Sequence, residues 1–117
     1  MVGILQADIF TNKTALITGA ASGIGRGLAV HAAKLQMNVV LMDLNADGLN
    51  ETHSLMTECP SMIIHCDVSN LEDFSKAKEK IASEFGTVHF LFNNAGIFLE
   101  GRAWKADQKN WQRIIDV

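Results

Sequence analysis

Short apolar runs alternate with longer amphipathic stretches along the whole chain. The apolar runs predict four strands, at residues 14–19, 38–43, 61–67 and 88–93. Between and after them, apolar residues recur at steps of three and four, which predicts helices over about residues 22–36, 47–58, 69–85 and 107–117. The predicted order is therefore βαβαβαβα.

The strands are apolar on both faces, so both faces of their sheet must be covered. Strands of this kind that are joined by helices form parallel sheets, and right-handed crossovers then place helices on both sides. The expected fold is α/β, a Rossmann-type doubly wound parallel sheet that stops after the fourth strand and its following helix. Residues 1–12 are expected to be an N-terminal extension, and residues 13–117 one incomplete dinucleotide-binding unit.

Three local signals mark helix ends. Pro60 is expected to end the second helix. Ser69, with Glu72 three residues later, forms a capping-box pattern that opens the third. Gly86 is placed to end that third helix.

Composition narrows the class of protein. A net charge of −3 argues against a broad basic surface for nucleic acid or anionic lipid. With only two cysteines, Cys59 and Cys66, a disulfide framework is not expected. Neither a signal-peptide pattern nor an apolar run of about 18 residues is seen. We therefore expect a soluble cytoplasmic protein.

The first strand runs into a glycine-rich turn, TGAASGIG, over residues 18–25. Gly19 would allow a sharp turn, Gly23 would let the backbone approach a pyrophosphate, and Gly25 would let the helix pack closely on the sheet. The pyrophosphate would lie at the helix N-terminus, where backbone N–H groups and the helix dipole favour negative charge. The hydroxyl of Ser22 could add a donor. The alternative is a plain strand–helix turn in which glycine only relieves crowding.

Asp43 ends the second strand, 18 residues after Gly25. An acid at about this spacing accepts hydrogen bonds from the adenosine ribose. Its charge would repel a 2′-phosphate, which favours NAD over NADP. Arg26 is near in sequence but lies inside the predicted helix, so we discount it as a phosphate ligand. The alternative is that Asp43 only caps the following turn.

Four motifs together resemble the short-chain dehydrogenase/reductase family. They are the turn at residues 18–25, Asp43, the pair Asp67-Val68, and NNAG at residues 93–96. Trp111 followed by IIDV at residues 114–117 is similar to that family's next helix. The resemblance covers about residues 10–117. It implies that NAD contacts Gly19, Ser22, Gly23, Ile24, Gly25, Asp43, Leu44, Asp67, Val68, Asn94, Ala95, Gly96 and Val117.

The resemblance also implies which functional residues the chain lacks. The family's catalytic Asn, Ser and Tyr-x-x-x-Lys would follow Val117, and the sequence contains no tyrosine. We therefore assign no catalytic residue. We also assign no metal ligand, because His53, Cys59, His65 and Cys66 do not have a familiar zinc spacing.

Two interpretations of function remain. In the first, the chain is the NAD(H)-binding part of an oxidoreductase that interconverts alcohols and ketones and is inactive alone. In the second, it is a non-catalytic truncated isoform that binds a nucleotide or pairs with a partner. The codons that follow Val117 would distinguish them. In both, the fourth strand would be an exposed edge that invites self-association. Methyltransferases of similar fold share the glycine turn and the acid but do not combine them with NNAG.

Overall fold

The computed structural model describes residues 9–97 and 107–117. Its centre is a parallel sheet with strand order β3-β2-β1-β4. The strands are β1 (Thr14–Thr18), β2 (Asn38–Asp43), β3 (Ser61–His65) and β4 (Phe90–Phe92). The order and the parallel pairing confirm the predicted Rossmann-type sheet, and they bring the carboxyl ends of β1, β2 and β4 together at one edge.

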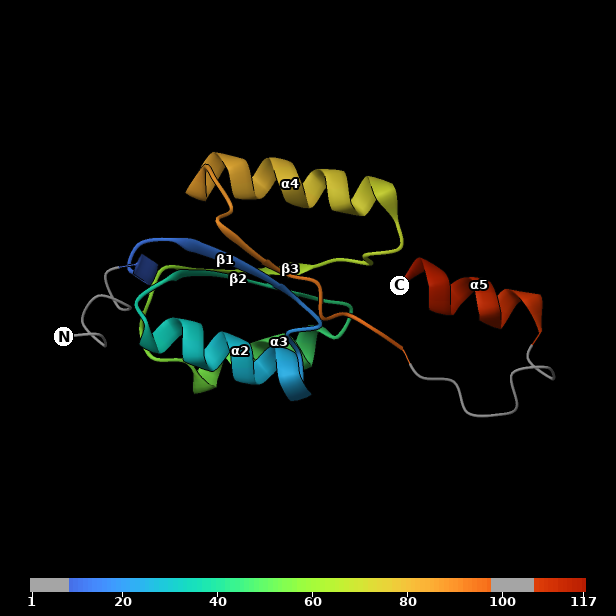
Figure 1. Ribbon diagram of the computed structural model, residues 1–117, viewed down its shortest axis with the longest axis horizontal. Helices are drawn as coiled ribbons and strands as arrows, with labels where there is room; N and C mark the ends of the chain where they lie inside the picture. Colours follow the sequence, from blue (N-terminus) through green and yellow to red (C-terminus); the bar gives the residue numbers. More distant parts are fainter. Residues whose placement is uncertain (1–8, 98–106) are drawn as a thin grey trace.

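Helices cover both faces of the sheet (Figure 1). On one face lie α2 (Gly23–Lys34) and α3 (Ala46–Leu55), and on the other lies α4 (Leu71–Phe85). Successive residues of a strand point to opposite faces. Ala15 and Ile17 therefore pack in the cluster beneath α2 and α3. Leu16, between them, packs in the cluster beneath α4.

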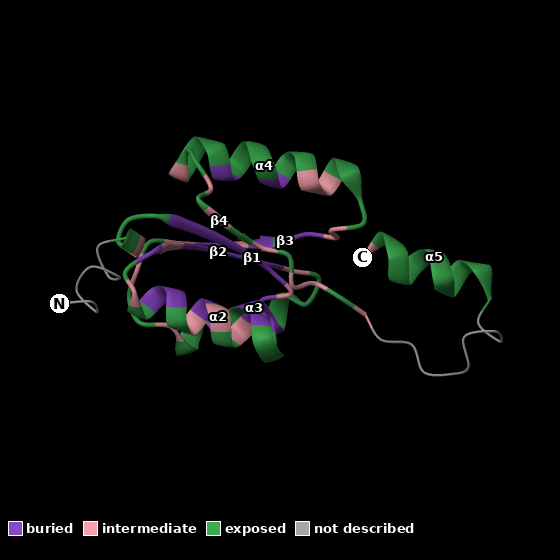
Figure 2. Cartoon of the chain, in the orientation of Figure 1, coloured by how far each residue is buried: buried purple, intermediate pink, exposed green. Residues whose placement is uncertain are grey.

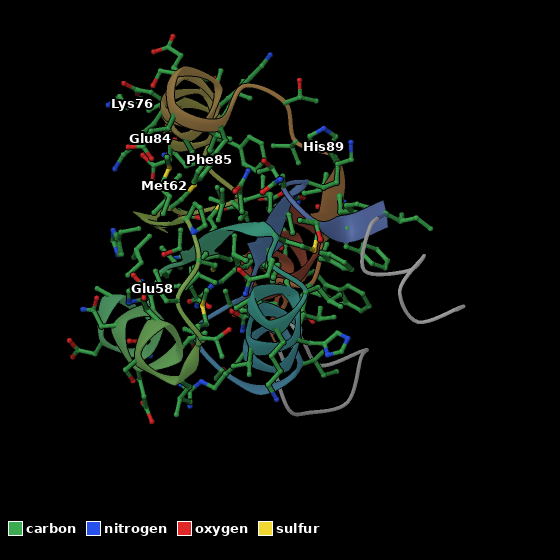
Figure 3. The ribbon with its side chains drawn as sticks, turned by 90° about the vertical axis from the view of Figure 1, so that its left-hand side faces the viewer. Glu58, Met62, Lys76, Glu84, Phe85 and His89 are labelled. Carbon is green, nitrogen blue, oxygen red and sulfur yellow. The ribbon has the colours of Figure 1, made fainter. Side chains whose placement is uncertain are left out.

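The α4 layer is held by an apolar cluster of its own. Met62 of β3 and Phe85 of α4 both belong to it, and Figure 3 shows them on the two sides of this interface. α4 buries only Ala77 and Ile81 completely, which suits a helix whose other faces are charged.

Two helix ends differ from the expectation. The cap of α4 is Asn70, whose side chain accepts a hydrogen bond from Asp73 N at 3.0 Å, so the predicted capping box at Ser69 is wrong. The hydroxyl of Ser69 instead donates to Asp67 at 2.6 Å. α3 ends at Leu55, before Pro60, because the chain must extend to reach β3. Gly86 ends α4 with a φ of 73°, as predicted.

β4 is shorter than predicted and forms the edge of the described sheet. It pairs only with β1 within the described residues, and Leu91 is 52% exposed. His89 leads into it: its backbone N–H donates to Thr14 O, and its ring Nδ1 accepts from Thr14 N at 3.0 Å. This double contact sets the register of β4 against β1.

The last helix, α5 (Gln108–Asp116), lies beyond the carboxyl edge of the sheet (Figure 1) and buries none of its residues (Figure 2). Asp107 caps it by accepting a hydrogen bond from Asn110 N at 2.7 Å. Across the described residues, no helix is long and apolar enough to cross a membrane.

Candidate functional site

The glycine turn joins β1 to α2 at the carboxyl edge of the sheet. Gly19 and Gly23 both have positive φ, 67° and 56°, which side-chain-bearing residues rarely adopt. A Cβ on Gly25 would overlap the carbonyl of Gly19, so only glycine allows α2 to come this close to the turn. At Gly23 a Cβ would meet nothing within 4 Å. The turn therefore has one tightly packed side and one open side.

The open side suits an anion. α2 has no acidic residue in its first turn, and its N-cap, Ser22, makes no side-chain hydrogen bond to the helix. The first N–H groups of a helix have no partner within the helix, and they carry a partial positive charge. Ser22, Gly23 and Ile24 are exposed at this point. The residues present therefore fit a bound pyrophosphate.

The loop after β4 is tied to the glycine turn by Thr18. Its buried hydroxyl accepts hydrogen bonds from Asn94 N at 3.0 Å and from Ala95 N at 2.9 Å. The Asn94 side chain adds two hydrogen bonds to the same segment, donating to Thr18 O at 3.2 Å and to Gly19 O at 3.3 Å. The turn and the loop therefore form one unit.

The carboxylate of Asp43 stands beside the same turn. One of its oxygens accepts a hydrogen bond from Ala21 N at 3.1 Å, and the other accepts from Asn45 N at 3.0 Å. Two backbone donors thus fix the orientation of the carboxylate. Each carboxylate oxygen has two lone pairs, so each can still accept a further hydrogen bond.

A cavity of about 170 Å³ connects these parts. Eight of the thirteen residues expected from sequence line it: Gly19, Asp43, Leu44, Asp67, Val68, Ala95, Gly96 and Val117. The other five are not part of its lining. Gly25 and Asn94 pack behind Gly19, while Ser22, Gly23 and Ile24 begin α2.

Four lining residues were missed by the sequence analysis: Cys66, Ser69, Ile97 and Arg113. Arg113 lies four residues before Val117, and this spacing places two residues on one face of a helix. That signal could have found it. The other three each lie within one position of an expected residue or motif, and nothing in the sequence singles them out.

Two of the lining residues, Asp67 and Cys66, have shifted pKa values. Hydrogen bonds from the side chain and the backbone of Ser69 lower the pKa of Asp67, and the charge of Arg113 lowers it further. Burial and the nearby carboxylates of Asp73 and Asp67 raise the pKa of the Cys66 thiol. At neutral pH Asp67 is therefore a carboxylate and Cys66 a protonated thiol. Among the described residues, no group of His, Cys, Asp or Glu could hold a metal ion.

The strand order and the glycine turn at the carboxyl edge define a Rossmann-type α/β protein. A sequence model of the family described as "short chain dehydrogenase" matches residues 13–117. The chain therefore belongs to the short-chain dehydrogenase/reductase family. One relative, estradiol 17-beta-dehydrogenase 11 of Pongo abelii, is 42% identical over 111 residues, which cover 92% of this chain and 36% of that protein.

Solved structures agree with the fold. A short-chain dehydrogenase/reductase of Burkholderia phymatum in complex with NAD superposes with a TM-score of 0.87 at 35% identity, covering 92% of this chain and 39% of that one. L-sorbose reductase of Gluconobacter frateurii, complexed with NADPH and L-sorbose, gives a TM-score of 0.81 at 32% identity, covering 88% and 40%. The chain spans about two-fifths of the length of the curated relatives that it matches.

Proposed function

We propose that this chain binds NAD(H) across the carboxyl edge of its sheet. The observation that carries the proposal is the fixed carboxylate of Asp43, which stands beside a glycine turn whose helix start is open and has no acidic residue. The turn would hold the pyrophosphate, Asp43 the adenosine ribose, and the cavity lined by Asp67, Val68 and Val117 the adenine. Residues 94–96 would form the remaining wall.

The preference for NAD over NADP is part of the proposal. A 2′-phosphate would have to lie near the Asp43 carboxylate, which repels it. Since Arg26 donates to Ala21 O and Thr52, it is not placed to neutralise that phosphate. Relatives with NAD and with NADPH are both known, so this preference must be measured on the chain itself.

Replacing Asp43 with alanine is expected to weaken NADH binding about tenfold or more, because hydrogen bonds to a carboxylate are worth roughly 1.5–3 kcal/mol. The measurement is titration of the purified 117-residue chain with NADH and NADPH, followed by nucleotide fluorescence. Asp43→Asn is the matched control, because it keeps the shape of the side chain and removes its charge. The affinity for NADPH should therefore rise relative to the affinity for NADH. Equal binding of NADH by wild type and Asp43→Ala would contradict the proposal.

We further propose that the whole protein transfers a hydride between NAD(H) and an alcohol or ketone. When bound, the nicotinamide supplies that chemistry. The residues of this chain would bind and orient the nucleotide, while proton transfer would need the Asn, Ser and Tyr-x-x-x-Lys that the family resemblance implies. The family membership and the site support this reaction class.

A second candidate function is pairing with another copy of the chain. β4 has a partner on one side only within the described residues, and an exposed apolar edge invites further strand pairing. The exposed Leu91 on β4 and the unburied apolar residues Ile114 and Ile115 on α5 favour this proposal.

Leu91→Lys is expected to shift any self-associated species toward monomer, because a charged edge strand resists pairing. Sedimentation velocity over a range of concentrations measures the shift. Leu55→Lys is the control, since Leu55 is equally exposed, at 55% against 52%, but lies on α3 away from the edge. An association that both variants reduce equally would exclude β4 as the contact.

A further inference from the structure

Arg26 lies in the first turn of α2, and its side chain contacts both the glycine turn and α3. Its Nη2 donates to Ala21 O at 2.6 Å, and its Nε donates to the hydroxyl of Thr52 at 3.0 Å. A weaker ion pair joins it to Glu51 at 3.4 Å, but that carboxylate is 66% exposed. Arg26 therefore links the turn to α3 mainly through hydrogen bonds.

Thr52 completes the link from the other side. It is fully buried and donates its hydroxyl proton to Ala20 O at 2.7 Å. α3 comes this close because it has Gly48 at the contact, where a Cβ would lie 2.7 Å from the Ala21 Cβ. The carbonyls of Ala20 and Ala21 are thus both held by hydrogen bonds to Thr52 and Arg26.

The peptide between Ala20 and Ala21 transmits this orientation. A trans peptide is planar, and its C=O and N–H point in opposite directions. When Thr52 holds Ala20 O toward α3, the N–H of Ala21 must point away from α3. It points at Asp43, whose carboxylate accepts it at 3.1 Å. Asp43 is therefore oriented by a chain of contacts that begins on α3.

We propose that Arg26 and Thr52 are positioning residues that set the NAD-over-NADP preference by fixing the carboxylate of Asp43. The inference rests on the proposed NAD(H) binding. The hydrogen bonds of both side chains join the turn, α2 and α3, so neither is assigned a contact with the nucleotide. If the link is lost, the Ala21 peptide can rotate, and Asp43 loses the donor that holds it against the turn.

The test compares dissociation constants for NADH and NADPH on the full 117-residue chain. Arg26→Met and Thr52→Val are both expected to lower the ratio of the NADPH constant to the NADH constant about tenfold. NADH loses its hydrogen bonds to a fixed carboxylate, while NADPH is relieved of part of its repulsion. Thr52→Ser keeps the hydroxyl and should restore the wild-type ratio. Lys34→Met removes the same charge from an exposed position on α2 and should leave the ratio unchanged.

Other outcomes would overturn the inference. If Arg26→Met weakens NADPH more than NADH, Arg26 acts as a cation for the phosphate. If Arg26→Met weakens binding of both nucleotides equally while the midpoint of thermal unfolding falls, the role of Arg26 is structural only. Wild-type chain that binds neither nucleotide would refute the proposed function itself.

A measurement without nucleotide tests the link through Arg26 and Thr52 separately from the proposed NAD(H) binding. Hydrogen exchange of the Ala21 amide, followed by NMR, should accelerate in Arg26→Met and Thr52→Val but not in Lys34→Met. Unchanged protection of Ala21 in the first two variants would show that they do not hold this peptide, whether or not NADH binds.

Discussion

Gly25→Ala is expected to lower the free energy of unfolding by about 3 kcal/mol, because overpacking against backbone is costly. The new Cβ would overlap the Gly19 carbonyl and lie 2.7 Å from the Asn94 side-chain nitrogen. Neither neighbour can move freely, since Gly19 forms the turn and Asn94 donates to two carbonyls of the same segment. Guanidinium unfolding followed by circular dichroism measures the change.

The chain offers a control two residues further along. Gly27 lies on the same helix, is exposed, and would place a Cβ in open space. Gly27→Ala should therefore raise stability by roughly 0.5–1 kcal/mol through its better helix propensity. If the two variants unfold at the same denaturant concentration, close packing of α2 on the turn is not the reason for a glycine at residue 25.

The layers of the fold could be predicted because burial on both faces leaves a strong local pattern. The central residues of β1 and β2 alternate between the two apolar clusters, so the sequence there is almost continuously apolar. β4 was predicted too long, at residues 88–93 against Phe90–Phe92. An apolar run indicates burial, while the length of an edge strand depends on how far its one partner extends.

The start of α4 shows where local pattern fails. Ser69 and Asn70 are both good caps, and each has an acid three residues later, Glu72 and Asp73. The sequence does not distinguish these two possibilities. The choice depends on Asp67, which accepts hydrogen bonds from both the backbone and the hydroxyl of Ser69 and so leaves Asn70 to cap the helix.

Site residues could be predicted where the local sequence alone places them, at the end of a strand or in a turn. Asp43 and Gly19 are of this kind, and both line the cavity. Arg26 was discounted only as a phosphate ligand, because it lies inside a helix, and its contacts with α3 were not predicted. Its contacts with Thr52 and Ala21 depend on how α2 packs against α3, and nothing local in the sequence encodes that packing.

Thr18→Val is expected to destabilise the chain by about 2 kcal/mol although it preserves side-chain volume. The threonine hydroxyl accepts the N–H groups of Asn94 and Ala95. Valine would leave the Ala95 N–H without this acceptor, while the Asn94 N–H would keep its bond to Phe92 O at 2.9 Å. A buried donor that loses its partner costs roughly 1–3 kcal/mol. Chemical unfolding measures the total, and faster amide exchange at Ala95 would locate the loss.

Thr18→Ser distinguishes the contribution of the hydroxyl to stability from that of the methyl group. Serine keeps the acceptor, so its cost should be limited to the lost methyl, about 1 kcal/mol. The Thr18 hydroxyl holds the backbone of Ala95 in the cavity wall. Thr18→Val should therefore also weaken NADH binding in molecules that remain folded, whereas Thr18→Ser should not. Equal stability of the two variants would mean that the loop after β4 is held by the Asn94 side chain, and that the hydroxyl of Thr18 is dispensable.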